Sequence, residues 1–315
     1  MAQCYYTHQT DPFINLAQEM SLVQAAQEPV LYLWQNAPSI ILGRCQNVWA
    51  ELDVTRCNEQ GVQIVRRETG GGAVYHDLGN LNFSFIVPRA LYDVDGQTQV
   101  ILQALAAVGV QAQQSGRNDL LVDGRKISGS AYRLDSNCLH HGTLLYNVDL
   151  HKLGSCLTPS HLKLQAKGVK SVRTRVCNLI ELVPTLTLGA LGDALVRQFQ
   201  RQYGAGLPQQ LSPIPGTAQK AVELRSAAWR FNATPPFDVV CEHRFAFGQV
   251  SVHLRIVSGH VREAMVFTDA LNTQWTQRLQ QAWSGVPYGS TLSQRAQELD
   301  DPQAEELGKW METII

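Results

Sequence analysis

Hydrophobic residues recur at every third or fourth position in several stretches of the chain, which is the spacing of an amphipathic helix. The first such stretch follows Asp11 and Pro12, which suit the N-cap and the first position of a helix. Two later stretches stop before Gly109 and Gly204, and glycine favours the end of a helix. Helices are therefore predicted to start at Pro12 and to span 97–108, 188–203, the residues around Trp275–Trp283, and 291–299.

Other stretches alternate or are continuously apolar, as strands are. Val30–Trp34 and Ser39–Gly43 are separated by turn-forming residues and are predicted to pair as a hairpin. Leu81–Val87 alternates, which indicates a strand with one buried face. Asp123-Gly124 can adopt the positive φ angles of a tight turn and is predicted to join two short strands within 119–128. Further strands are predicted at 62–67, 142–149, 245–257 and 261–267.

These elements do not alternate as in a doubly wound parallel sheet, so the sequence favours an α+β fold. Residues 204–216 are rich in Pro and Gly and predict a loop or linker. The strand pattern starts again beyond Pro235-Pro236. We therefore expect a large domain at 1–234 and a small α+β domain at 235–315, and a length of 315 residues also suggests about two domains at ~150 residues each.

Composition excludes several classes of protein. The chain carries 26 Lys and Arg against 27 Asp and Glu, and this balance, without a basic run, argues against a nucleic-acid partner. The N-terminus lacks the pattern of a secretory leader, and no stretch reaches the ~18 apolar residues of a membrane span. We expect a cytoplasmic protein without a membrane partner. Its seven cysteines form neither a C-x-x-C pair nor a disulfide framework.

Candidate chemistry is densest around the three glycines at 70–72. Glycines that follow a strand let main-chain N–H groups approach a phosphate, and Arg67 could offer its guanidinium to the same anion. A flexible loop or a bulge is the alternative for an isolated Gly-Gly-Gly. A Walker loop is excluded because no Gly-Lys-Ser/Thr follows, and the Rossmann glycine pattern is incomplete.

Three further residue types are candidates for a site. Lys126 follows the Asp-Gly turn among small residues, where an ammonium can hold a phosphate or a carboxylate; a solvated hairpin lysine is the alternative. Asp119 could help to hold Mg²⁺, although turn formation is a common use of Asn-Asp. His140 and His141 are neighbours on a predicted strand and would point to opposite faces, so at most one of them should line a pocket.

Five ordered blocks of sequence together resemble the lipoate-protein ligase family. They are residues 66–80, 116–120, 125–132, 140–145 and 166–176. Weaker similarity, at 229–232 and 267–269, extends toward the C-terminal end. The resemblance implies a large catalytic domain of the kind shared with biotin protein ligases, with mixed and mainly antiparallel sheets, and a small accessory domain.

The resemblance also implies two half-reactions. Lipoate and Mg-ATP would give lipoyl-AMP and pyrophosphate, and a lysine of a lipoyl domain would then attack the mixed anhydride. The acceptors would be E2 subunits of 2-oxoacid dehydrogenases and the glycine cleavage H protein. Residues 166–176 would cap the adenylate.

The resemblance and the residue types together assign roles to nine residues. Lys126 would be catalytic and would contact both lipoate and the nucleotide. Asp119 is the candidate for the metal. The other ATP contacts would be Arg67, Gly72, Ala73, Val74 and Tyr75, and the other lipoate contacts would be Gly71 and His141.

Some features depart from this family or leave alternatives open. Glu68 and Thr69 stand where many members carry small hydroxyl residues, so Glu68 is expected to point away from the anion. A related octanoyltransferase uses a cysteine nucleophile without ATP; Cys156 would be its first candidate thiol and Cys138 its second, although no Pro-Cys-Gly occurs. A biotin protein ligase and a lipoate-binding protein without turnover are the remaining alternatives.

Overall fold

The structure, a computed structural model, describes residues 1–116, 118–157, 176–231, 238–257 and 259–314. Its largest unit is an eight-stranded sheet in which β1 runs parallel to both of its neighbours and every other pair is antiparallel. In spatial order the strands are β11 (Gln209–Gln210), β1 (Gln3–Tyr6), β2 (Val30–Trp34), β6 (Asn80–Pro88), β10 (Asn137–Leu145), β9 (Arg125–Arg133), β8 (Asp119–Val122) and β7 (Gln113–Ser115). The predicted α+β class with mixed, mainly antiparallel sheets is confirmed.

A second, three-stranded sheet contains β4 (Gln63–Arg66), β3 (Ser39–Leu42) and β5 (Val74–His76), with β3 in the middle. The predicted hairpin of β2 and β3 is therefore wrong, because the two strands belong to different sheets. Both strands are buried along their whole length. A strand covered on both faces reads as a continuous apolar run, and such a run does not show which strand lies beside it.

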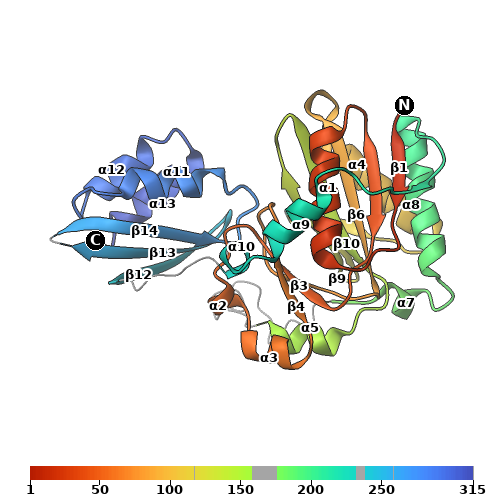
Figure 1. Ribbon diagram of the computed structural model, residues 1–315, viewed down its shortest axis with the longest axis horizontal. Helices are drawn as coiled ribbons and strands as arrows, with labels where there is room; N and C mark the ends of the chain where they lie inside the picture. The colour runs from red at the N-terminus through yellow and green to blue at the C-terminus, as the bar shows by residue number, and fades with distance from the viewer. Residues whose placement is uncertain (117, 158–175, 232–237, 258, 315) are drawn as a thin grey trace.

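Helices cover both faces of the large sheet (Figure 1). α1 (Pro12–Ala25) lies on one face, and the Asp11 side chain accepts hydrogen bonds from two N–H groups of its first turn, as predicted. α4 (Val94–Ala107) and α8 (Leu188–Tyr203) pack on the other face, where they share a core with Phe83 and Phe85 of β6. The central strand β6 is thus buried on both sides, and the prediction of a single buried face is wrong.

Shorter elements complete this part of the chain. α9 lies against α1, and apart from β11 the predicted linker at 204–216 forms no regular element. The remaining elements are α2 (Val48–Glu51), α3 (Val54–Glu59), the 3₁₀ turn η1 (Arg89–Leu91), α5 (Leu150–Cys156), α7 (Leu179–Leu182), α9 (Thr217–Arg225) and α10 (Ala227–Phe231).

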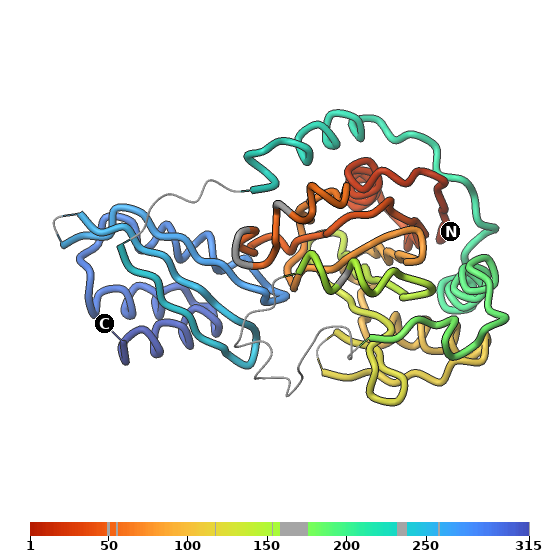
Figure 2. Tube along the Cα trace, turned by 90° about the horizontal axis from the view of Figure 1, so that it is seen from below, coloured from red at the N-terminus to blue at the C-terminus, as the bar shows by residue number. Residues whose placement is uncertain are grey.

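The C-terminal part has its own antiparallel sheet and its own core, drawn in blue in Figures 1 and 2. Trp275, Leu279 and Trp283 are fully buried in it. Its elements are β12 (Val239–Phe245), β13 (Gly248–Val257), β14 (His260–Thr268), α11 (Gln274–Trp283), α12 (Thr291–Gln297) and α13 (Pro302–Met311). Residues 232–237 lie outside the described residues, so the domain boundary at 234/235 stays a proposal. None of the helices described has the length and apolar character needed to span a bilayer.

Candidate functional site

A layer of buried polar side chains lies on the α1 side of the large sheet. His141 of β10 is paired with Ser84 of β6 on one side and with Ala131 of β9 on the other, so these three residues form a row across the sheet. The next row joins Asn82 and Thr143 to Gly129 in the same way. Paired residues on adjacent strands share a face. Because the β9 members of these rows are glycine and alanine, no long side chain of β9 projects from them.

The glycine loop, defined here as Gly70–Gly72, lies next to this face of β9. A β-carbon built on Gly71 would be 3.8 Å from the Ala131 Cβ atom. Gly71 has a φ of +89°, which glycine adopts without strain, and its N–H donates to the Ala270 carbonyl oxygen at 2.8 Å. A β-carbon on Gly70 would be only 2.3 Å from that oxygen. The loop after β14 is therefore packed directly on the glycine loop.

Arg67 is a buried side chain that holds the glycine loop by its carbonyl oxygens. Its side chain is 6% exposed, and it donates to Thr69 Oγ1 and to the carbonyl oxygens of Ile41, Gly70 and Gly72. Burial lowers the pKa of Arg67 to about 10, so the guanidinium is still protonated at neutral pH. A trans peptide group directs its N–H opposite to its C=O, so the Ala73 N–H points away from Arg67. Arg67 thus orients the loop; its predicted contact with ATP stays a prediction.

Lys126 lies farther along the same face of β9. Its Nζ atom is 2.7 Å from Asp119 Oδ1 and 2.6 Å from the position of a β-carbon built on Gly129. A register shift against β8 places an extra residue in β9, and this bulge brings Lys126 and Gly129 to one face. Gly129 and Ala131 are two residues apart, about 7 Å along a strand. The ammonium group and the glycine loop therefore border the same short stretch of β9.

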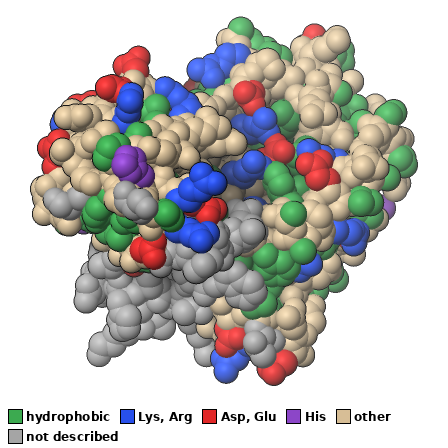
Figure 3. Space-filling view, turned by 60° about the vertical axis from the view of Figure 1, so that its left-hand side comes forward, with side chains coloured by type: hydrophobic (Ala, Val, Ile, Leu, Met, Phe, Trp, Pro, Cys, Tyr) green, Lys and Arg blue, Asp and Glu red, His purple; other side chains and the backbone are tan. Residues whose placement is uncertain are grey.

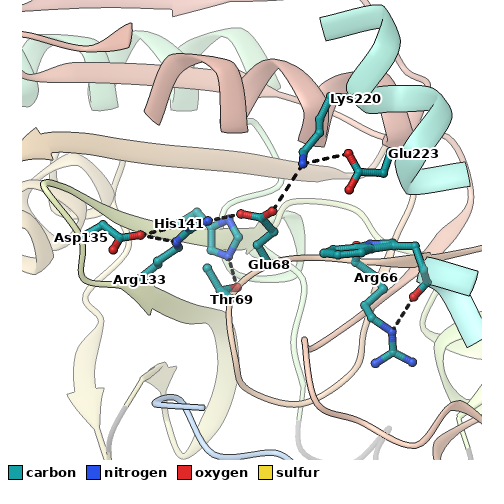
Figure 4. Close-up of polar contacts among 9 residues, drawn as sticks. Arg66, Glu68, Thr69, Arg133, Asp135, His141, Lys220 and Glu223 are labelled. Atoms are coloured by element: carbon teal, nitrogen blue, oxygen red, sulfur yellow. Dashed lines mark hydrogen bonds and ion pairs between the residues drawn. The ribbon is translucent and has the colours of Figure 1, made fainter. Parts of the chain in front are cut away.

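His141 connects the sheet to the residue before the glycine loop, as Figure 4 shows, and also to α1. Its Nε2 atom is 2.8 Å from Thr69 Oγ1, and its Nδ1 atom is 2.8 Å from Glu19 Oε1. His140 points to the opposite face, as expected, where it contacts Phe83 and burial lowers its pKa to about 3. Only His141 of the pair faces the side of the glycine loop. Its predicted contact with lipoate stays a prediction.

Glu68 turns toward α9 and away from the glycine loop (Figure 4). Its carboxylate forms an ion pair with Arg133, and its other oxygen lies 3.9 Å from Lys220 Nζ. Arg133 also pairs with Asp135 at 2.7 Å. This placement agrees with the expectation that Glu68 does not contact the anion.

The remaining predicted ATP contacts follow the loop into β5. Tyr75 is 2% exposed and packs in the core of the small sheet with Ile40 and Leu42, whereas Ala73 and Val74 are half-buried. The Tyr75 ring is thus a core side chain. Any contact of Tyr75 with a nucleotide would have to come from its main chain.

The described residues provide no preformed magnesium cage. No group of three or more His, Cys, Asp or Glu side chains in that part of the chain could hold a metal ion, and Asp119 is paired with Lys126. Mg²⁺ commonly keeps most of its ligands as waters and substrate phosphates. The ion therefore fits this site only as a companion of the nucleotide, and Asp119 stays a prediction as a ligand.

Both candidate thiols of a cysteine mechanism are inaccessible. Cys156 is fully buried at the end of α5, where its Sγ atom is 3.6 Å from Gln60 Oε1. Cys138 is also fully buried, in β10. Buried thiols in such surroundings are structural rather than reactive. Of the predicted cap at 166–176, only Val176 is described, and it forms a parallel β-bridge with Lys126.

Figure 3 shows several Lys and Arg side chains where the C-terminal part meets the rest of the molecule. The two parts are joined by main-chain hydrogen bonds here; for example, the Thr268 N–H donates to the Cys45 carbonyl oxygen at 2.6 Å.

Comparison with solved structures shows which proteins share this fold. P. falciparum LipL1, solved in complex with lipoate, is 27% identical over 99% of this chain and 100% of its own, with a TM-score of 0.88. The bi-partite ligase of Thermoplasma acidophilum, studied with its E2 lipoyl domain, is 25% identical over 76% of this chain and 100% of its own, with a TM-score of 0.64. A lipoate-protein ligase A bound with ATP shares the fold at 24% identity over 73% of this chain and 98% of its own, with a TM-score of 0.62.

Two family models cover most of the sequence. Residues 234–310 match the model of the bacterial lipoate protein ligase C-terminus. Residues 11–200, which hold the glycine loop, Lys126 and His141, match the model of the lipoyl protein ligase A/B catalytic domain. With more than half of its length in that match and a similar fold in the solved ligases, the chain belongs to the lipoate-protein ligase family.

Proposed function

We propose that this protein activates lipoate with ATP to form lipoyl-AMP, and then transfers the lipoyl group to a lysine of lipoyl-domain proteins. The observation that carries the proposal is the placement of the Lys126 ammonium and the glycine loop along one stretch of β9. The lipoate bound to LipL1, the ATP bound to the ligase of similar fold and the E2 lipoyl domain of the archaeal system support it.

In the first half-reaction a carboxylate oxygen of lipoate attacks the α-phosphorus of ATP, and the bond to pyrophosphate breaks. Two anions must meet, so fixed positive charge between them has to become more favourable as the transition state forms. Lys126 and the outward N–H of Ala73 are suited to that task. Asp119 holds the ammonium over Gly129 before the reactants arrive. Magnesium, carried by the phosphates, would neutralise part of their charge.

In the second half-reaction the acceptor lysine attacks the carbonyl carbon of lipoyl-AMP, and AMP leaves. The attacking amine must be neutral, whereas a free lysine has a pKa of about 10.4. Desolvation near the cationic Lys126 would disfavour a second ammonium and so lower the pKa of the acceptor lysine. Acceptors would be E2 subunits of 2-oxoacid dehydrogenases and the glycine cleavage H protein, in the cytoplasm.

Transfer from preformed lipoyl-AMP should therefore accelerate as pH rises from 6 to 9, because the neutral fraction of the acceptor lysine grows with pH. Single-turnover transfer to an apo lipoyl domain, sampled across this range and followed by mass spectrometry, measures the effect. A rate that does not change with pH would contradict an amine that must lose its proton before attack.

One assay tests the proposed function as a whole. The protein is incubated with lipoate, ATP, Mg²⁺ and an apo lipoyl domain, and the mass of the acceptor is followed. We expect a gain of one lipoyl group that disappears when ATP is omitted. Biotin in place of lipoate, read by pyrophosphate release, separates this activity from that of a biotin protein ligase. A protein that binds lipoate but never modifies the acceptor would be a binding protein without turnover.

Thiol catalysis is tested by removing both candidate nucleophiles. The double variant Cys156→Ser, Cys138→Ser should keep ATP-dependent lipoylation, because both thiols are buried and neither is needed for adenylation. Lipoylation by the double variant is compared with that of the unaltered protein at matched folded concentration, judged by circular dichroism. Selective loss of transfer in a folded double variant would favour the octanoyltransferase mechanism.

A further inference from the structure

Glu19 is a buried carboxylate to which the proposed reaction gives no role. It lies on α1 and is 2% exposed. Its Oε1 atom receives two contacts, from Ser84 Oγ at 2.6 Å and from His141 Nδ1 at 2.8 Å. Leaving a carboxylate in the interior is costly unless hydrogen bonds compensate it. The contacts with Ser84 and His141 provide this compensation, and they connect Glu19 to other buried polar side chains.

The donors at the two ends fix the direction of the hydrogen bonds. Trp34 Nε1 can only donate, and it donates to Ser84 Oγ at 3.0 Å, so the Ser84 hydroxyl is free to donate to Glu19. At the other end Arg67 Nε can only donate, and it donates to Thr69 Oγ1 at 2.9 Å. Hydrogen bonds are thus donated into the network at both ends, and the Glu19 carboxylate, which lies between these ends, only accepts.

His141 connects the two halves of this network. Since Glu19 accepts, His141 Nδ1 carries a proton, and the Nε2 atom on the other side of the ring shares a hydrogen bond with the Thr69 hydroxyl. Thr69 in turn accepts from Arg67, whose guanidinium also holds the carbonyl oxygens of Gly70 and Gly72. A continuous chain of hydrogen bonds therefore runs from α1 to the glycine loop.

We propose that Glu19 is a positioning residue. Its carboxylate sets the tautomer and the ring orientation of His141, and through Thr69 and Arg67 it holds the glycine loop in the conformation that receives the anionic reactants. The first part of the proposal, that Glu19 holds the conformation of the glycine loop, concerns the fold alone. The second part, that this conformation receives the anionic reactants, rests on the proposed function. Glu19 contacts no reacting atom in this scheme and acts only through the other residues.

Hydrogen exchange of the full-length protein tests the first part without any activity. In Glu19→Ala, amides in the peptide 66–76 should exchange about tenfold faster or more, because a loss of ~1.4 kcal/mol in local opening corresponds to a factor of ten. Glu19→Gln keeps an acceptor oxygen and should restore most of the protection. The matched control is Gln18→Ala, which removes a buried side chain of α1 that accepts from the Tyr32 hydroxyl instead.

Kinetics test the second part. With lipoate saturating, the KM for ATP in pyrophosphate release should rise by about ten- to a hundredfold in Glu19→Ala, the size of effect known for residues that orient metal-binding side chains. It should stay near the unaltered value in Gln18→Ala.

The two readouts separate the possible failures. Equal exchange at 66–76 in Glu19→Ala and Gln18→Ala would overturn the proposal, and so would a general rise over all peptides of Glu19→Ala. An unaltered KM in Glu19→Ala would overturn its second part. If the unaltered protein released no pyrophosphate, the proposed function would fail, while selective exchange at 66–76 would still support the positioning of the loop by Glu19.

Discussion

Replacing Lys126 by alanine should slow the formation of lipoyl-AMP by about 10²–10³-fold, the usual effect of removing one preorganised electrostatic group. The ammonium lies over Gly129, on the face of β9 that the glycine loop borders, and Asp119 holds it there. Without it the approach of the carboxylate to the α-phosphate loses its fixed positive charge. Lipoate-dependent release of pyrophosphate, measured before any acceptor is added, isolates this step.

A second lysine serves as the control for Lys126. Lys309 lies on α13, is exposed, and pairs with Glu305 within its own helix. Lys309→Ala removes the same charge and the same number of atoms, and it should release pyrophosphate at the rate of the unaltered protein. Normal release by Lys126→Ala would show that the ammonium has no part in adenylation, and the proposed mechanism would then be wrong.

Replacing Gly70 by alanine should destabilise the protein and impair adenylation. The new β-carbon would lie 2.3 Å from the Ala270 carbonyl oxygen and 2.4 Å from that of Leu271, and main-chain atoms cannot turn aside as side chains can. The two loops must separate, which should cost ~1–3 kcal/mol of stability, the usual penalty of overpacking. Thermal unfolding measures this loss, and pyrophosphate release measures the displacement of the loop.

Gly192→Ala is the matched substitution for Gly70→Ala. Gly192 lies inside α8, where the new methyl group would meet Leu33 Cδ1 at 3.7 Å, an ordinary contact. Alanine should raise the stability there by ~0.5–1 kcal/mol, because glycine is unfavourable within a helix. If Gly70→Ala unfolded at the same temperature as the unaltered protein, the close packing of the two loops would be disproved.

Elements that depend on local signals were predictable from the sequence. α8 spans 188–203 as predicted, because Gly204 adopts the left-handed conformation at its C-cap. The turn after β8 has positive φ at Asp123 and Gly124, as its sequence requires. α11 buries the aromatic residues whose spacing predicted it. In each case the residues that decide the structure lie within a few positions of one another.

Strand pairing could not be predicted in the same way. Whether β3 pairs with β2 or with β4 depends on contacts far apart in sequence, and a fully apolar strand carries no sign of its partner. β10 begins at Asn137, five residues before the predicted start, because it pairs with β6 along its entire length. α2, α3, α5, α7 and α10 were missed because seven residues or fewer barely repeat a helical spacing, and α9 and α13 were missed as well.

Many residues of the candidate site could be predicted from the sequence, but the contacts between them could not. The sequence indicated Lys126, Arg67 and the glycines, but it did not indicate that the Arg67 donors reach the loop carbonyls. Glu19 carried a signal that was overlooked, a carboxylate on the apolar stripe of α1 beside Leu16 and Met20. The contact of Ala270 with the loop joins residues almost 200 positions apart, and no local pattern reports it.

The bulge in β9 has a consequence for anyone who transplants this chemistry. Lys126 and Gly129 are three positions apart, and in a regularly paired strand they would lie on opposite sides. The extra residue sends Ile127 into the apolar core with Leu120, while the lysine stays above the glycine. A designed hairpin that copied residues 125–131 with ideal pairing would therefore separate the two, so a scaffold must reproduce the irregular backbone together with the amino acids.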